Sequence, residues 1–416
     1  MRSPGAIAIG ASVLVAACTT SGTAATTRTA ATPTTTRGLP VTTLTVAVPA
    51  STLPATSTTA TPSAWVSLPE SPLTPRHGHS AIWTGEELII WGGTDNPGLL
   101  DPFSNDGAAY DPVERSWRKI AEAPIGKRLW HSAVWTGGEM IVWGGFGDHA
   151  VVEAAAYQPV TDTWRPIADA PISPRWWGHS TTWTGTEMII WGNRPGESAE
   201  PVGAAYDPAV DTWRVLPASP VGNRTWHSAV WTGEELIIWG GQSFADGARA
   251  EYLSDGAAYE PVSDTWRLIS AAPIGGRWQH TAVWTGATMI IWGGAASDES
   301  LDALADGAIY DPASDSWSTL APSPIAARNE HAAFWVDGSM IIWGGLERTS
   351  GSSWAQFSDG AVYDPATGSW TPLPDAPAAG TLTTTPSIWT GEHLLYWGQG
   401  NDFSTSGGAA HATPAP

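Results

Sequence analysis

The sequence predicts an all-β protein made of seven repeated units, on the strength of three observations. A Trp-Gly pair followed by Gly, Asn or Gln occurs at Trp91, Trp143, Trp191, Trp239, Trp292, Trp343 and Trp397. A period near fifty residues is typical of propellers and solenoid arrays. The composition of 45 Gly and 27 Trp with 14% charged residues favours a turn-rich β protein. Each unit also reads as short apolar segments separated by turn residues, without helical periodicity.

The order of segments within one unit predicts four antiparallel strands, which we call a to d. "HSAVWTGGEMIVWGG", beginning at His131, gives strands a and b around a Thr-Gly turn. After a variable loop, "AAYQPVTDTW", beginning at Ala155, gives strands c and d. A single four-stranded sheet has two unpaired edges and cannot close its own core, so the units must pack face to face around an axis. The predicted architecture is therefore a β-propeller.

Two spaced elements extend this prediction to a family. The Gly pair follows strand b, and a Tyr lies seven residues before a Trp in six copies: Tyr110 and Trp117, Tyr157 and Trp164, Tyr206 and Trp213, Tyr259 and Trp266, Tyr310 and Trp317, Tyr363 and Trp370. This combination resembles the kelch repeat and covers nearly everything after Trp65. The resemblance implies a seven-bladed kelch-type β-propeller with four antiparallel strands per blade.

The seventh copy departs from this pattern. It keeps Trp397 but has no Tyr and Trp pair after it, and the sequence ends at "GGAAHATPAP". "AWVSLPESPLTPR" around Trp65 matches "SWRKIAEAPIGKR" around Trp117. We therefore expect the N-terminal strand to complete the last blade, which removes the open sheet edge.

The N-terminal region predicts export and membrane anchoring. Residues 1–17 have Arg2 followed by an apolar stretch too short to span a bilayer as a mature helix, as in a signal peptide. The segment Val15-Ala16-Ala17-Cys18 resembles the lipobox of bacterial lipoproteins, which implies lipidation of Cys18; an ordinary secretory peptide is the alternative. Residues 18–62 are rich in Thr, Ala and Pro and read as a disordered tether. We expect residues 63–416 to form the propeller, and the lipid anchor to hold it outside the cytoplasm of a bacterial cell.

Charge and cysteine content limit the possible partners. The net charge is −21, and after removal of Arg2, Arg28 and Arg37 the residues beyond 62 hold 16 basic and 40 acidic side chains. Nucleic acid is excluded as a partner because phosphate binding requires clustered Lys and Arg. The only cysteine is Cys18, so no disulfide supports the fold.

Strand order places the loops on two faces. The a–b and c–d turns lie on one face and are nearly uniform, as in "TGEE", "TGGE" and "TGTE". The b–c and d–a segments lie on the other face and are as unlike as "TDNPGLLDPFSND" and "FGDHAVV". Because binding residues usually lie on loops held by a rigid frame, we expect the ligand on this variable face, at the mouth of the channel.

Aromatic residues on the variable face are the candidate ligand-binding residues. Of the 27 tryptophans, 21 occupy repeat positions that fit packing within or between blades. The other six map to the variable face: Trp130, Trp176, Trp177, Trp226, Trp278 and Trp354. They either pack one blade entrance on the next or form an aromatic platform for a sugar ring, an apolar group or a cation.

Two further rings of repeated residues are predicted to be structural. His79, His131, His179, His227, His280 and His331 lie on separate blades and cannot converge on one metal ion, so we expect hydrogen bonds between neighbouring blades. Arg76, Arg128, Arg224, Arg277 and Arg328 are expected to pair with Asp106, Glu153, Asp255, Asp306 and Asp359. The third blade has Arg175 opposite Val202, which makes Arg175 the arginine available to a ligand.

The sequence favours a binding module over an enzyme. It holds no cysteine nucleophile within the propeller, no HExxH motif and no phosphate-binding glycine loop, so we assign no catalytic residues, no cofactor and no metal. We expect a monomer that binds an extracellular glycan or protein, and that contacts the membrane only through the lipid anchor. The alternative is an extracytoplasmic enzyme acting on a carbohydrate, similar to kelch-type sugar-acid epimerases.

Overall fold

The structure of the chain is a computed structural model in which the described residues form only β-strands and connecting segments. It describes residues 66–96, 102–147, 153–173, 178–192, 202–243, 250–297, 303–350, 353–373, 387–391, 393–398 and 409–412. Within these ranges, no helix has the length and apolar character needed to cross a lipid bilayer. The predicted signal peptide, tether and lipidated Cys18 lie outside the described residues.

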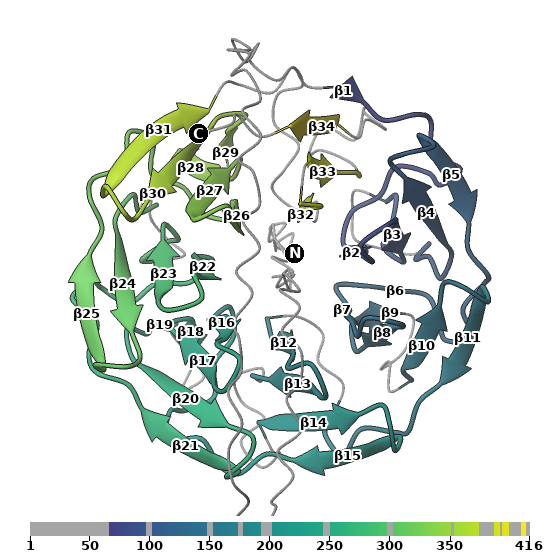
Figure 1. The fold of residues 1–416 in the computed structure, drawn as a ribbon, viewed down its shortest axis with the longest axis horizontal. Helices are drawn as coiled ribbons and strands as arrows, with labels where there is room; N and C mark the ends of the chain where they lie inside the picture. Colours follow the sequence, from purple (N-terminus) through teal and green to yellow (C-terminus); the bar gives the residue numbers. More distant parts are fainter. Residues whose placement is uncertain are drawn as a thin grey trace, which may run out of the picture.

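The strands form a ring of four-stranded antiparallel sheets around a central opening (Figure 1). Six sheets, which we call blades 1 to 6, are each built from one stretch of the chain, with strand a innermost and strand d outermost. Blade 1 contains β2 (Ser80–Trp83), β3 (Leu88–Trp91), β4 (Gly107–Asp111) and β5 (Ser116–Lys119), and blade 2 contains β7 (Ser132–Trp135), β8 (Met140–Trp143), β10 (Ala155–Gln158) and β11 (Thr163–Pro166). Blade 3 contains β12 (Ser180–Trp183), β13 (Met188–Trp191), β14 (Gly203–Asp207) and β15 (Thr212–Val215).

The second half of the ring repeats this order. Blade 4 contains β16 (Ser228–Trp231), β17 (Leu236–Trp239), β20 (Gly256–Glu260) and β21 (Thr265–Leu268). Blade 5 contains β22 (Thr281–Trp284), β23 (Met289–Trp292), β24 (Gly307–Asp311) and β25 (Ser316–Thr319). Blade 6 contains β26 (Ala332–Val336), β27 (Ser339–Trp343), β30 (Gly360–Asp364) and β31 (Ser369–Leu373).

The expectation of seven blades, the last one closed by the N-terminal strand, is corrected to six continuous blades and one composite sheet. The composite sheet has the order β1 (Val66–Ser67), β34 (Ala409–Ala412), β33 (His393–Tyr396) and β32 (Ser387–Trp389), and so joins the two ends of the described chain. The two outer strands of this sheet, β1 and β32, are short. Strand β1 pairs with β34 through Val66 opposite Ala410 and Ser67 opposite Ala409. Among the described residues, the fourth strand of this sheet is β1, from the opposite end of the chain.

Packing between blades explains why the repeated apolar positions are large. The Trp before each Gly pair is almost fully buried. The same strand b supplies buried Ile, Leu and Met side chains, and the adjacent strand c supplies buried Ala side chains. The core consists of clusters that each join two adjacent blades, such as Ile89 and Trp91 of blade 1 with Met140 and Val142 of blade 2. Gly92 is required where a Cβ would lie 2.6 Å from the His131 ring and where the φ angle is +71°. The Gly pair thus lets the next blade approach closely.

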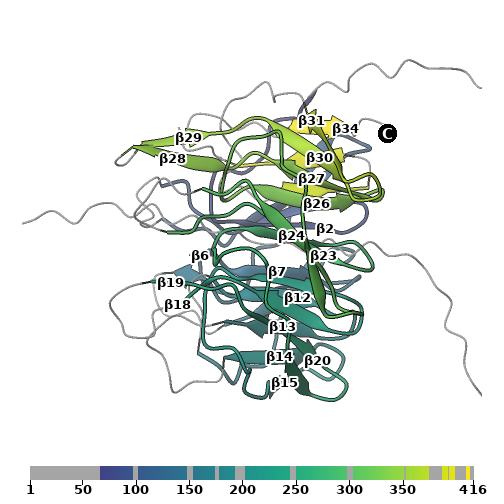
Figure 2. The same ribbon diagram turned by 90° about the vertical axis from the view of Figure 1, so that its left-hand side faces the viewer.

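The two faces of the ring differ as the strand order predicts. Three additional two-stranded sheets extend from the b–c and d–a segments: β6 (Arg128–Leu129) with β9 (Phe146–Gly147), β18 (Gln242–Ser243) with β19 (Glu251–Tyr252), and β28 (Leu346–Ser350) with β29 (Ser353–Gln356). They lie on one side of the ring, and the β28–β29 hairpin projects away from it (Figure 2). The opposite face carries short turns in which a Thr hydroxyl accepts the amide hydrogen three residues on, as Thr136 does from Glu139 at 2.9 Å.

Candidate functional site at the channel mouth

The buried arginines on the variable face form the predicted ion pairs. Arg277 is representative: its guanidinium contacts both carboxylate oxygens of Asp306 at 2.9 and 3.2 Å, and donates to the carbonyls of Gly275 and Gly293. Equivalent pairs join Arg76 to Asp106, Arg128 to Glu153, Arg224 to Asp255 and Arg328 to Asp359. In each pair the arginine is buried and its acid is partly exposed to solvent. In each of these five pairs, the carboxylate is therefore the member that faces solvent.

Five of the six inner histidines hydrogen-bond to a side chain of the preceding blade, as predicted, whereas His79 has no such bond among the described residues. The Nε2 atom of His131 lies 2.9 Å from the Ser80 hydroxyl of the preceding blade. The same bond joins His179 to Ser132, His227 to Ser180, His280 to Ser228 and His331 to Thr281. Each of these histidine rings also packs edge-on against the buried Trp of the preceding blade, as His131 does against Trp91 with centroids 4.8 Å apart. The histidine ring is part of the frame.

Burial keeps these histidines neutral. It lowers the pKa of His331 to about 3, and the nearby Arg328 guanidinium lowers it further. Burial and the arginine of the same blade also hold the pKa values of His131, His227 and His280 well below their usual range. Among the described residues, no group of three His, Cys, Asp or Glu side chains is placed to hold a metal ion.

The residue immediately before each inner histidine adopts a left-handed backbone conformation. The φ angles are +66° at Gly78, +54° at Trp130, +78° at Gly178, +60° at Trp226, +52° at Gln279 and +52° at Glu330. We call these six residues the mouth ring, because they lie at the inner end of each d–a segment on the variable face. A positive φ is uncommon for residues other than Gly and costs about 1 to 3 kcal/mol, and such strain concentrates at functional sites.

Backbone hydrogen bonds link the mouth ring in pairs. The Trp130 amide donates to the Gly78 carbonyl and the Trp226 amide to the Gly178 carbonyl, both at 2.8 Å. The Glu330 amide donates to the Gln279 carbonyl at 3.3 Å. Two pairs thus combine Gly with Trp, while the third combines two polar residues. The mouth is therefore asymmetric.

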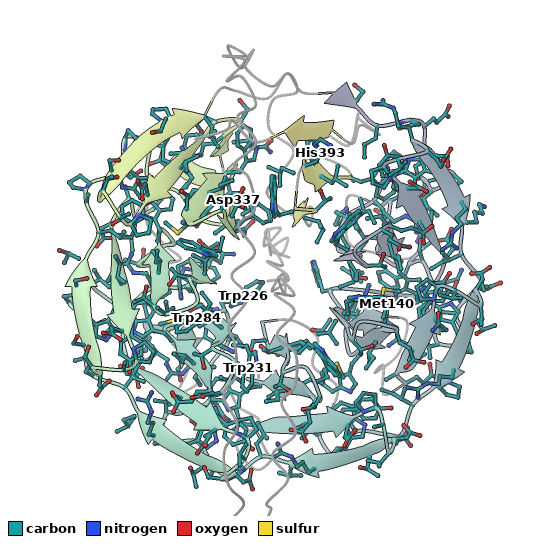
Figure 3. The ribbon with its side chains drawn as sticks, in the orientation of Figure 1. Met140, Trp226, Trp231, Trp284, Asp337 and His393 are labelled. Atoms are coloured by element: carbon teal, nitrogen blue, oxygen red, sulfur yellow. The ribbon has the colours of Figure 1, made fainter. Side chains whose placement is uncertain are left out.

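The structure corrects the expected exposure of two candidate tryptophans. Trp130 and Trp226 are each only 7% exposed, so they do not form the open aromatic platform that the sequence predicted. Trp130 packs in a small cluster with Phe103, Leu129 and the partly buried Phe146, contributed by blades 1 and 2. These contacts come from loops of neighbouring blades, which the single repeat does not reveal. Trp226 lies next to the central opening (Figure 3).

Of the other candidates, Trp278 is placed where a ligand could reach it. Its half-buried ring lies 6.1 Å from the Trp226 ring and 6.3 Å from the Tyr252 ring, so three aromatic rings follow one another at the entrance of blades 4 and 5. Trp354 lies in β29, with its backbone paired to Arg348. Arg175, Trp176 and Trp177 lie outside the described residues.

Two polar residues that the sequence analysis did not select stand out at the mouth. Gln279 and Glu330 are 6% and 8% exposed, and the Gln279 side-chain amide donates to a Glu330 carboxyl oxygen at 2.5 Å. Burial raises the pKa of Glu330 to about 8, while the bond from Gln279 opposes that shift. A buried carboxyl with a strongly shifted pKa in a mouth is a candidate functional group. The signal available in the sequence was the polar pair at a position filled by Gly or Trp in the earlier blades.

Comparison with known proteins agrees with this repeat architecture. Residues 178–384 match the sequence model of the KLHDC2/KLHL20/DRC7 Kelch-repeats domain. The chain belongs to the kelch-repeat family.

The individual proteins that this chain resembles are distant from it in sequence. "Kelch-like protein terF" from Aspergillus terreus is 28% identical over 148 residues, which are 33% of this chain. That stretch spans only 32% of the fungal protein, so the chain covers about a third of this relative's length. The solved "Structure of YjhT" matches with a TM-score of 0.53 and 15% identity, covering 74% of this chain and 99% of the other. At this identity the likeness shows a shared propeller fold alone.

Proposed function

We propose that this kelch propeller is an envelope-anchored binding module that holds an extracellular protein partner on its variable face. The contrast between the two faces carries the proposal. One face repeats a short hydrogen-bonded turn, while the other carries three extra two-stranded sheets and an asymmetric mouth ring. Kelch β-propellers are a general type of protein-binding module, which favours a protein over a glycan as the partner.

We further propose that the composite sheet acts as the seventh, closing blade. The ring then has no open sheet edge, and this matters for a module exposed outside the cell without a disulfide. A repeated contact supports this proposal. Trp397 of the composite sheet packs edge-on against His79 of blade 1, as Trp91 of blade 1 packs against His131 of blade 2.

Membrane attachment is the part of the proposal that rests on Cys18. Replacing Cys18 with Ala removes the thiol that a diacylglyceryl group would occupy, so the chain should leave the membrane fraction or remain unprocessed. Mature Cys18→Ala protein that still sediments with membranes would show that the anchor is elsewhere.

Site-directed crosslinking tests which face binds. In a full chain carrying Cys18→Ser, a single cysteine can be placed on the variable face at Glu251 or on the uniform face at Thr186, both exposed. A photo-crosslinker on Glu251→Cys should capture envelope proteins in a reproducible band that is absent for Thr186→Cys. Equal capture from both faces, or capture from Thr186→Cys alone, would contradict the assignment. Probing the same chain on a glycan array tests the glycan alternative.

The enzyme alternative has weaker support. Catalysis at a channel mouth would require at least two titratable side chains and an arginine within hydrogen-bond reach of one another. Glu330 has a shifted pKa, but its hydrogen-bond partner is Gln279, and the adjacent Arg328 is held by Asp359 at 2.8 Å. The described residues at this mouth therefore supply one such carboxyl.

A further inference from the structure

The entrance of blades 5 and 6 differs chemically from the other described entrances. At the mouth-ring position, Gln279 and Glu330 replace the Gly and Trp pairs of blades 1 to 4. Both side chains are more than nine-tenths buried, and each is the other's partner. The pair bridges blades 5 and 6 through this side-chain hydrogen bond and through the backbone bond from Glu330 to Gln279. The earlier blades make the backbone contact with Gly and Trp, so the polar side chains are specific to this entrance.

The charges around Glu330 do not include a cation that neutralises it. The neighbouring Arg328 donates to both carboxylate oxygens of Asp359. His331 follows in the same blade and His280 lies in the adjacent blade, and both are kept neutral by burial. The described surroundings of Glu330 thus consist of Gln279, neutral imidazoles and an arginine already paired. A carboxyl in this setting keeps its proton at neutral pH.

Two buried polar atoms near this pair lack hydrogen-bond partners. They are the Oδ1 atom of Asn329, which precedes Glu330, and the Nε1 atom of Trp278, which precedes Gln279. Buried polar atoms are usually satisfied in folded proteins. Other unpaired atoms occur at repeated positions of the frame, such as Nδ1 of His131, His227 and His280, whereas Asn329 and Trp278 are not repeat residues, so their acceptor and donor are specific to this entrance. The partner must offer a donor to Asn329 and an acceptor to Trp278.

The wider face favours a positively charged group. In the five described arginine pairs the arginine is buried, while the partner acid is 33 to 59% exposed. The residues beyond 62 also hold 40 acidic against 16 basic side chains, so their net charge is negative, and the faces of aromatic rings such as Trp226 and Trp278 attract cations. An acidic ligand would be repelled by the same groups.

We propose that the entrance formed by blades 4 to 6 binds an arginine side chain of the partner protein, with Glu330 and Asn329 as acceptors and Trp226 and Trp278 beside the guanidinium. This inference rests on the proposed binding function. A guanidinium offers several donors in one plane and so serves two acceptors better than an ammonium group does. The adjoining peptide carbonyl would accept from Trp278 Nε1. This requirement favours a peptide over a free amine.

Binding would be accompanied by the loss of a proton. The free carboxyl of Glu330 is protonated, and it must ionise to form the ion pair with the guanidinium, so its proton passes to the buffer. With a pKa of about 8, about nine-tenths of the molecules carry that proton at pH 7. We therefore expect close to one proton to be released for each arginine bound at pH 7, and less at higher pH.

Titration calorimetry of the full chain tests this directly. The probe is the blocked peptide acetyl-Gly-Gly-Arg-Gly-Gly-amide, titrated at pH 7 in phosphate and in Tris, whose ionisation enthalpies differ. The dependence of the binding heat on the buffer gives the number of protons released.

The variant Glu330→Gln should abolish proton release and weaken binding by about tenfold or more, as expected when one partner of a buried charge pair is lost. The control Glu251→Gln removes an exposed charge from the same face and should change affinity less than threefold.

Several outcomes would overturn the inference without touching the proposed function. These are equal binding of the arginine peptide and its Gly-Gly-Glu counterpart, absence of binding by the arginine peptide, and binding by the wild-type chain without proton release. The last measurement needs no variant and remains decisive if Glu330→Gln folds poorly. The crosslinking experiment at Glu251 and Thr186 reports separately on whether the face binds a protein at all.

Discussion

The indole of Trp397 packs edge-on against the imidazole of His79, with ring centroids 5.5 Å apart. The two residues are 318 positions apart in sequence and join the composite sheet to blade 1. The Trp117 indole, which belongs to blade 1, also donates to the Pro69 carbonyl at 3.1 Å, as Trp164 of blade 2 does to Ala121 at 2.8 Å. The segment after β1 thus occupies the place of the segment that follows strand d in a continuous blade.

Removing the N-terminal strand should therefore open the ring. Deletion of residues 63–70 removes β1, the Pro69 carbonyl and part of the cover over Trp397, and leaves unpaired edges at β34. We expect a fall of several degrees or more in the thermal unfolding midpoint, measured by circular dichroism. Deletion of residues 41–48, within the predicted tether, is the matched control and should have no effect. Equal midpoints for the two deletions would show that closure by β1 contributes little.

The Arg277 and Asp306 pair should respond unequally to its two substitutions. Arg277 is 1% exposed and also holds the carbonyls of Gly275 and Gly293, whereas Asp306 is 56% exposed. Arg277→Ala leaves several buried carbonyls without a donor and should cost about 3 kcal/mol of unfolding free energy. Asp306→Asn retains the arginine and its carbonyl contacts and should cost under about 1 kcal/mol. Urea denaturation measures both, and a larger loss for Asp306→Asn would reverse this assignment.

Much of the frame could be predicted from sequence because it is repeated. The Arg and acid pairs recur at fixed spacing within a blade, and the inner histidines recur at fixed spacing from one blade to the next, so repetition reveals both kinds of contact. The burial of Trp130 and Trp226 could not be predicted in this way, because the contacting Phe103 and Trp278 come from neighbouring blades. The Gln279 and Glu330 pair is likewise notable because both residues have a positive φ and are buried. Neither property can be predicted from the residue types alone.

The neutral histidines make the fold sensitive to acid. Burial lowers their folded-state pKa values, to about 3 for His79 and His331, while an unfolded histidine has a pKa near 6.5. Their contribution is fully present above about pH 6.5 and is lost as the pH falls below that value, at up to about 1.4 kcal/mol per pH unit for each histidine. Urea midpoints should fall between pH 7 and pH 5. In the His131→Gln variant, the slope of stability against pH should fall by about one proton. An unchanged slope would mean that the pKa of His131 is not lowered by folding.

Glu330 should act in the opposite direction. Burial raises its folded-state pKa to about 8, against an ordinary value of 4.5, so the folded chain holds one proton more than the unfolded chain between these values. The contribution of Glu330 to stability is fully present below about pH 4.5 and is lost as the pH rises toward 8, because burying the ionised form is unfavourable.

The variant Glu330→Gln keeps the shape of the side chain and a hydrogen bond to Gln279 but cannot ionise. The variant should match the wild type near pH 4.5 and gain about 1.4 kcal/mol relative to it for each pH unit up to about 8. Urea denaturation of both proteins across this range measures the difference, with Glu251→Gln as a control that should follow the wild type. A constant difference between Glu330→Gln and the wild type would show that Glu330 does not hold its proton in the folded chain, and would remove the basis for proton release on binding.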